Sequence, residues 1–175
     1  MTTASIEQTT AHWTLDPDNT SVSFAIKTFW GLTTVYGRFD RFDGRYNTGP
    51  DGTRIALTID ADSLDTGNRM RDRHLRSADF LHIAEHPHVR FTSTHVSDAG
   101  DGTLHVEGLL EAAGKDVPLK FDATIQPVDQ GLQIEATTTV DQSQLGMSSG
   151  QFGMIRRPAT LHITARLTGG GEVDA

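Results

Sequence analysis

The chain has 175 residues, no cysteine and a formal net charge of −8 at pH 7. This length suits one domain with a substantial core, and the negative charge argues against a nucleic-acid backbone or an anionic membrane surface as a general partner. Disulfides and thiolate chemistry are excluded, and no apolar stretch approaches the roughly 20 residues that a membrane-spanning helix needs.

Both ends of the chain are predicted to be flexible. Residues 1–11 are polar and rich in threonine, and the tail 169–175 begins with three glycines. Neither the basic nor the apolar segment of a signal peptide is visible near the start, so we expect a cytoplasmic protein. Residues 12–168 form one predicted domain.

Most of this domain consists of segments in which apolar and polar residues alternate. The apolar positions are Val22-Phe24-Ile26, Ile55-Leu57-Ile59, Val89-Phe91, Leu104-Val106, Val117-Leu119-Phe121-Ala123-Ile125, Leu132-Ile134-Ala136-Val140 and Leu161-Ile163-Ala165-Leu167. Period two is typical of a β-strand with one buried face. Turn residues between the segments suit antiparallel hairpins. About eight such strands predict an all-β sandwich or closed barrel.

One segment, residues 66–87, lacks this alternation. Asn68 is suited to cap a helix, which predicts a short helix near 69–77 and a helical turn near 80–85 before Pro87. In a barrel, such an insertion typically lies across one end.

Small residues on the apolar faces leave two interpretations open. They are Ala61, Gly108, Ala123, Ala136 and Ala165. Either they face large partners in a filled core, or they leave a cavity, as in eight-stranded ligand carriers. The longest alternations, 117–125 and 132–140, predict a barrel about 20–25 Å tall, which suits an extended chain better than a compact ring system.

Residues 82–86 read His-Ile-Ala-Glu-His, which matches the H-x-x-E-H motif of one class of zinc peptidases. Zinc in that motif needs two histidines one helical turn apart, a third ligand and the glutamate as general base. Pro87 ends any helix at the end of the motif, and eight histidines make accidental spacings common. We therefore expect no metal site; a zinc-dependent hydrolase through His82, Glu85 and His86 remains the least favoured hypothesis.

The arginines of the same segment form a basic cluster. It comprises Arg69, Arg71, Arg73 and Arg76, together with His74. Around a barrel mouth, such a cluster could attract a phosphate or carboxylate. We favour a solvated helix face on which Asp72 and Arg76 pair at i,i+4.

Three polar residues are predicted to face the interior. Ser93 and His95 continue the face of Phe91, and Thr138 lies on the face of Ala136. A ligand could satisfy them, although neighbouring strands or a buried water do so more often. No G-x-S-x-G elbow and no paired carboxylates occur on an apolar face. A barrel enzyme with His95 or His74 as acid–base is therefore only the alternative to a binding protein.

The chain resembles the YceI-like, polyisoprenoid-binding family over about residues 13–168. The motifs that resemble it are Trp-Thr-Leu-Asp-Pro at 13–17, Ser-Val-Ser-Phe at 21–24, Leu-Asp-Thr-Gly-Asn at 64–68, RDRHLRSADF at 71–80, PHVRFTST at 87–94, GLLEAAGK at 108–115, and Val140-Asp141 through Leu145-Gly146. The family commonly has histidine where Asn19 and Thr28 stand here, arginine where Gln142 stands, and other residues than histidine at 82 and 86. Residues 147–158 also depart from its pattern.

The resemblance implies an extended, eight-stranded antiparallel lipocalin-like barrel that binds a long apolar chain, often as a dimer, with no catalytic residues. We therefore predict non-enzymatic binding, transport or sequestration of a polyisoprenoid, an isoprenoid quinone or a long-chain fatty acid or amide, with no other cofactor, and a homodimer. The residues predicted to bind the ligand are Trp13, Phe24, Ile26, Phe39, Leu75, Phe80, Phe91, Ser93, His95, Phe121, Ala136, Thr138, Leu161 and Ile163.

Overall fold

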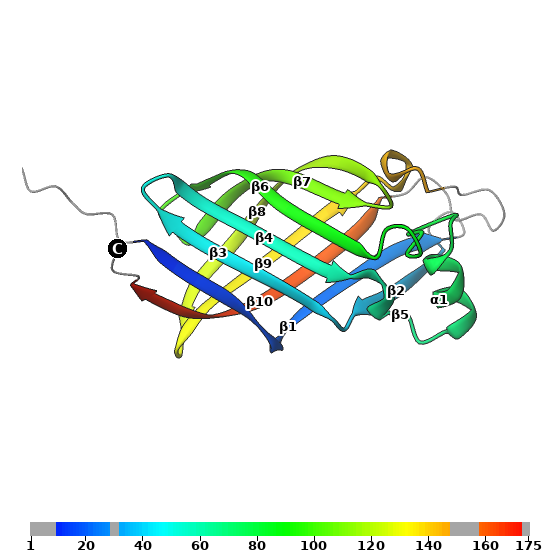
Figure 1. The fold of residues 1–175 in the computed structure, drawn as a ribbon, viewed down its shortest axis with the longest axis horizontal. Helices are drawn as coiled ribbons and strands as arrows, with labels where there is room; N and C mark the ends of the chain where they lie inside the picture. The colour runs from blue at the N-terminus through cyan, green and yellow to red at the C-terminus, as the bar shows by residue number, and fades with distance from the viewer. Residues whose placement is uncertain (1–9, 29–31, 148–157, 173–175) are drawn as a thin grey trace, which may run out of the picture.

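The computed structural model describes residues 10–28, 32–147 and 158–172, and these form one antiparallel sheet that closes into an eight-stranded barrel (Figure 1). The strands are β1 (Ala11–Thr28), β2 (Thr33–Phe39), β3 (Phe42–Gly49), β4 (Gly52–Asp60), β5 (Leu64–Asp65), β6 (His88–Asp98), β7 (Thr103–Ala112), β8 (Lys115–Val128), β9 (Gly131–Val140) and β10 (Ala159–Glu172). The predicted all-β barrel is confirmed.

The ten strands fill only eight places around the barrel, because two of these places each hold two short strands separated by a break. Strands β2 and β3 pair with successive stretches of β1, and the break between them falls at Asp40 and Arg41. In the same way, the 3-10 helix Ala61–Ser63 separates β4 from β5, which pair with β3 and β2 respectively. Every position otherwise pairs with the next one along the chain, and β1 pairs with β10 to close the barrel.

The predicted helix is confirmed as α1, Arg69–Arg76. The side-chain oxygen of Asn68 accepts hydrogen bonds from the backbone N–H groups of Met70 and Arg71, both at 3.1 Å, which satisfies two of the free donors at the helix start. The helix lies at one end of the barrel beside β2 and β5 (Figure 1). A series of turns over residues 77–86 then returns the chain to β6.

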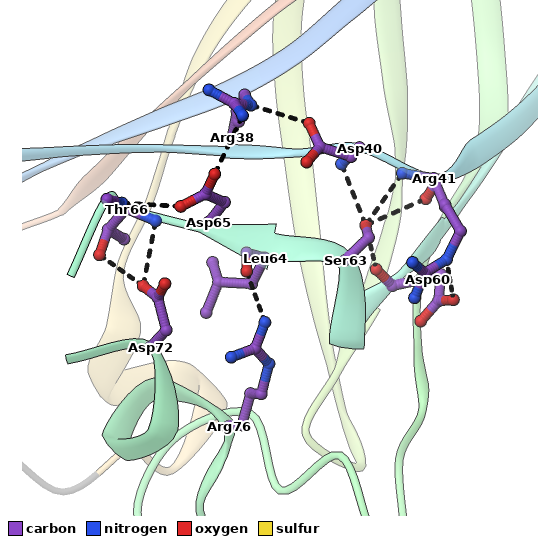
Figure 2. Close-up of polar contacts among 11 residues, drawn as sticks. Arg38, Asp40, Arg41, Asp60, Ser63, Leu64, Asp65, Thr66, Asp72 and Arg76 are labelled. Carbon is purple, nitrogen blue, oxygen red and sulfur yellow. Dashed lines mark hydrogen bonds and ion pairs between the residues drawn. The ribbon is translucent and has the colours of Figure 1, made fainter. Parts of the chain in front are cut away.

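Polar contacts fix α1 against the chain that precedes it. A guanidinium nitrogen of Arg76 donates to the carbonyl oxygen of Asp62 at 2.8 Å. The same nitrogen donates to the carbonyl oxygen of Leu64 at 2.6 Å, and the buried Asp72 carboxylate accepts from the backbone N–H and hydroxyl of Thr66 (Figure 2). The predicted pairing of Asp72 with Arg76 is therefore replaced by longer-range contacts that hold the helix in place.

The C-terminal strand is longer than the sequence predicts. The glycines at 169–171 indicate a flexible tail, but β10 continues to Glu172, which is paired with Ala11. A Cβ atom on Gly170 would lie 2.4 Å from the indole ring of Trp13, so the absent side chain leaves room for that ring. The glycines thus permit packing at this end of the barrel.

In the part of the chain that the structure describes, no helix has the length and hydrophobicity needed to cross a membrane.

The buried Ser63 stabilises the break between β2 and β3 at Asp40 and Arg41. Its hydroxyl oxygen accepts hydrogen bonds from the backbone N–H groups of Asp40 at 3.1 Å and Arg41 at 3.0 Å, and its hydroxyl donates to the carbonyl oxygen of Asp60 at 2.7 Å (Figure 2). Backbone groups that leave a sheet ladder need such partners when they are buried.

Replacing Ser63 with alanine should lower the free energy of unfolding by about 1–3 kcal/mol, because the backbone N–H of Arg41 loses its acceptor and that of Asp40 keeps only the 3.3 Å bond to the carbonyl oxygen of residue 63. Urea unfolding followed by circular dichroism measures this change. The exposed Ser21 provides the control, since Ser21→Ala should change stability by no more than about 0.5 kcal/mol. Equal losses in the two variants would contradict this role of Ser63.

Candidate functional site: an apolar channel inside the barrel

A cavity of about 190 Å³ runs along the inside of the barrel. On β10 its lining residues are Ala159, Leu161, Ile163, Ala165 and Leu167, every second residue over nine positions. At about 3.3 Å per residue and a strand tilt near 40°, this stretch extends about 20 Å along the barrel axis. A compact cavity of roughly 150 Å³ holds one benzene ring. Because the cavity found here has only a slightly larger volume but extends over about 20 Å, it is a narrow channel suited to a chain.

Two inward-facing glycines allow large aromatic rings to lie against the barrel wall. A Cβ atom on Gly37 of β2 would come within 2.2 Å of the ring of Phe24, and one on Gly108 of β7 within 2.5 Å of the ring of Phe91. With any other residue at these positions, both rings would have to move. The glycines therefore help to keep the rings out of the centre of the channel.

Alanines widen the channel in its middle. Ala123 of β8 and Ala136 of β9 are register partners, and Ala136 is also paired with Ile163 of β10. All three line the cavity, and Ala136 and Ile163 remain partly exposed although they lie on the inner face. Of the two interpretations left open by the sequence, the structure supports the cavity.

Most of the predicted ligand-binding residues line this channel. They are Phe24, Ile26, Phe39, Leu75, Phe80, Phe91, Phe121, Ala136, Thr138, Leu161 and Ile163. Eight strand positions contribute the walls, while α1 contributes Leu75 and the following turn contributes Phe80 and Leu81 at the helix end.

Three predicted residues lie elsewhere. Trp13 packs against Gly170, and the hydroxyl of Ser93 accepts a hydrogen bond from the backbone N–H of Ile55 at 2.8 Å. The prediction that His95 faces the interior is wrong: a β-bulge between Ser93 and His95 shifts the alternation, so that His95 is exposed and Val96 packs against the core.

The histidines considered for acid–base chemistry are therefore not in the channel. His95 is outside for the reason just given. The ring of His74 packs edge-on against Phe80 with 4.9 Å between ring centroids, and it is Phe80 that lines the cavity. Neither histidine is placed to reach a molecule held among the lining residues.

Few polar side chains reach the channel. Besides the hydroxyl of Thr138, they include the side chain of Tyr46, whose phenol pKa is raised above its usual range by burial. Another is the side chain of Gln142, in the 3-10 helix Gln142–Leu145 after β9. Its Nε2 atom is buried and has no hydrogen-bond partner among the described residues. A buried donor of this kind needs an acceptor.

Gln142 is a site residue that the sequence motifs do not indicate. Its position after β9 is set by Asp141, whose carboxylate accepts from the backbone N–H of Ser143 at 2.9 Å and so begins the 3-10 turn. The sequence offered one indication of its importance: the family that the chain resembles commonly has arginine at this position.

Three arginines of the basic cluster, Arg69, Arg73 and Arg76, line a polar depression outside the barrel beside α1. Its charged lining consists of Asp40, Asp62, Asp65, Asp72, Arg41, Arg69, Arg73 and Arg76. Acidic and basic groups are equal in number, so the depression has no net preference for an anion. Arg69 and Arg73 are exposed, as expected for a solvated helix face, whereas Asp72 is buried and does not belong to that face.

Comparison with protein families identifies a YceI-like domain over residues 13–167. A UPF0312 protein of Pectobacterium atrosepticum is 38% identical over 107 residues, which are 59% of this chain and 55% of that protein. Protein YceI of Salmonella arizonae is 38% identical over 98 residues, 54% of this chain and 51% of that protein. The chain thus spans about half the length of these curated relatives.

Solved structures share the fold at low sequence identity. BcnA of Burkholderia cenocepacia superposes with a TM-score of 0.78 at 18% identity, covering 87% of this chain and 98% of that chain. A polyisoprenoid-binding domain from Saccharophagus degradans gives 0.73 at 13% identity, covering 91% and 98%. At these identities the likeness establishes the barrel architecture.

A large side chain at position 136 should block the channel. Ala136→Phe is expected to abolish binding of a fluorescent fatty acid, cis-parinaric acid, while the melting temperature of ligand-stripped protein holds or rises, because the ring fills empty space. In a close-packed interior the same change would instead cost about 1–3 kcal/mol.

Thr139→Phe is the matched control, because Thr139 lies on the same strand and is exposed. It should leave binding of the fatty acid unchanged. A destabilised Ala136→Phe variant that binds the probe as well as the wild type would contradict the channel as the binding site.

Proposed function

We propose a function for this chain from the premise that it belongs to the YceI-like family, as the match over residues 13–167 shows. The protein binds one elongated apolar molecule inside its barrel and carries or sequesters it without changing it chemically. Candidate ligands are a polyisoprenoid, an isoprenoid quinone, or a long-chain fatty acid or amide. The observation that supports this most directly is the long, narrow and almost entirely apolar channel.

The chemistry of the lining supports binding in preference to catalysis. Among the described residues that line the channel there is no histidine, serine, lysine or carboxylate. General acid–base and nucleophilic catalysis most often use such a group, held within hydrogen-bond reach of the reacting atoms. The phenol of Tyr46 and the amide of Gln142 can donate hydrogen bonds and orient a ligand.

Burial of apolar surface is the interaction that this channel offers. Each methylene removed from water contributes about 0.8 kcal/mol. Affinity should therefore increase with chain length until the chain exceeds the length of the channel. A rigid ring system wider than a chain would require the walls to move. The channel thus favours long, flexible ligands.

The amide of Gln142 gives this channel a polar end. Its buried Nε2 donor would be satisfied by an acceptor oxygen on the ligand, such as the carbonyl of a quinone or an amide. Polyisoprenoids, the compounds after which the Saccharophagus degradans domain is named, agree with the apolar part of the proposal. We therefore propose a long apolar chain with a neutral oxygen acceptor near one end.

Native mass spectrometry of protein purified from cells should show one apolar molecule per chain. Organic extraction should return that molecule unmodified after incubation, because the described lining residues include no histidine, serine, lysine or carboxylate. Ala136→Phe protein, prepared in parallel, should contain none. The spectrum also reports whether the protein is the homodimer predicted from the family resemblance. Recovery of a stoichiometric product altered by the protein would favour the enzyme hypothesis.

Substitution of Gln142 by leucine should reduce the affinity for hexadecanamide several-fold, since one hydrogen bond contributes about 0.5–1.5 kcal/mol. Binding of hexadecane, which has the same chain and no acceptor, should hold or improve. Competition with cis-parinaric acid measures both. A loss of equal size for the two compounds would show that Gln142 only shapes the channel.

A further inference from the structure

The turn between α1 and β6 brings together three side chains that are common metal ligands. A ring nitrogen of His82, a ring nitrogen of His86 and a carboxylate oxygen of Glu85 all lie within 4.8 Å of one another. His82 Nε2 and Glu85 Oε1 are 3.9 Å apart, and the two imidazole centroids are 5.6 Å apart. None of the three residues lines the channel.

A single α-turn produces this arrangement without a continuous helix. The backbone N–H of His86 donates to the carbonyl oxygen of His82 at 2.9 Å, and that of Glu85 donates to the same oxygen at 3.1 Å. These bonds place residues four apart on the same side of the turn. Pro87 does prevent a longer helix, as expected from the sequence, but one turn is sufficient to bring both histidines of the H-x-x-E-H spacing together.

The backbone under these side chains is held in place from two directions. The N–H groups of His82 and Ile83 donate to the carbonyl oxygens of Ser77 at 2.9 Å and Arg76 at 3.2 Å, which ties the turn to the end of α1. A Cβ atom on Gly114, in the β7–β8 turn, would lie 2.7 Å from His86 Nε2, so the imidazole of His86 packs directly on that turn. The surroundings also maintain His82 at a φ of 49°, a conformation that non-glycine residues rarely adopt.

We propose that His82, Glu85 and His86 together bind one divalent transition-metal ion of the zinc type. Zinc lies about 2.0–2.2 Å from imidazole nitrogen and carboxylate oxygen, so neighbouring ligand atoms in a tetrahedron are about 3.3 Å apart. Rotation of the side chains can close the remaining distance, because those of His82 and Glu85 are 31% and 70% exposed. The same exposure lets an ion enter from solvent.

The donor set selects the class of metal. Two imidazoles and one carboxylate suit Zn²⁺ and its neighbours in the transition series, whereas Ca²⁺ and Mg²⁺ prefer sites made of oxygen ligands. Three protein ligands leave a fourth position to water. Because the ligands lie outside the channel, we assign the ion a structural role: it would clamp the turn whose Leu81 forms part of the channel wall.

Zinc titration of untagged, chelator-treated protein by calorimetry tests the site. The wild type should bind one Zn²⁺ per chain, and saturating Zn²⁺ should raise the melting temperature, since a ligand of the folded state stabilises it. His82→Asn, His86→Asn and Glu85→Gln should each weaken zinc binding roughly tenfold or more. Asparagine is chosen at position 82 because it tolerates a positive φ better than alanine does.

His105→Asn is the matched control, because His105 is also an exposed histidine beside a carboxylate, 2.6 Å from Asp122. This variant should bind zinc as the wild type does. The proposal is overturned if the wild type shows no saturable binding of one Zn²⁺ per chain, or if the double variant His82→Asn, His86→Asn retains that binding. Circular dichroism of each variant establishes that it is folded.

Discussion

Pairing of β1 with β10 closes the sheet, and the rest of the molecule depends on that closure. An eight-stranded barrel has an interior that ordinary side chains can just fill or that can hold one small ligand. Closure alone therefore does not decide between a core and a channel. The sizes of the inward-facing side chains decide it: Gly37 and Gly108 accommodate two phenylalanine rings along the wall, and the partners Ala123 and Ala136 leave space at the middle.

The helix end of the barrel combines two kinds of interaction on opposite sides of one wall. Outside, the hydroxyl of Ser63 accepts hydrogen bonds that fix the strand break, and Arg76 donates one that fixes α1. Inside, the elements held in this way present Leu75, Phe80 and Leu81 to the channel. The shape of the apolar channel at this end is thus set by polar contacts that a ligand never touches. The proposed metal ion would act on the same turn.

Strand alternation predicted an all-β sandwich or barrel and most of the residues that line the channel, the family resemblance selected the barrel, and the cap at Asn68 was sufficient to predict the helix. Prediction failed where the backbone departs from regular pairing. The bulge that turns His95 outward leaves no mark in an alternating sequence, and the glycines at 169–171 indicate flexibility unless their pairing partner is known. Whether Ala136 faces a large or a small neighbour depends on register across strands, which residue patterns alone do not supply.

The channel should select ligands by length and flexibility more than by chemical identity. Contributions of about 0.8 kcal/mol per methylene accumulate along an acyl or prenyl chain, whereas one amide hydrogen bond supplies about 0.5–1.5 kcal/mol, roughly a factor of two to ten in affinity. With few polar side chains, among them Tyr46, Thr138 and Gln142, the lining can rank head groups but cannot reject a well-fitting chain. The ligand bound in a cell would then depend on which long apolar molecules are abundant there.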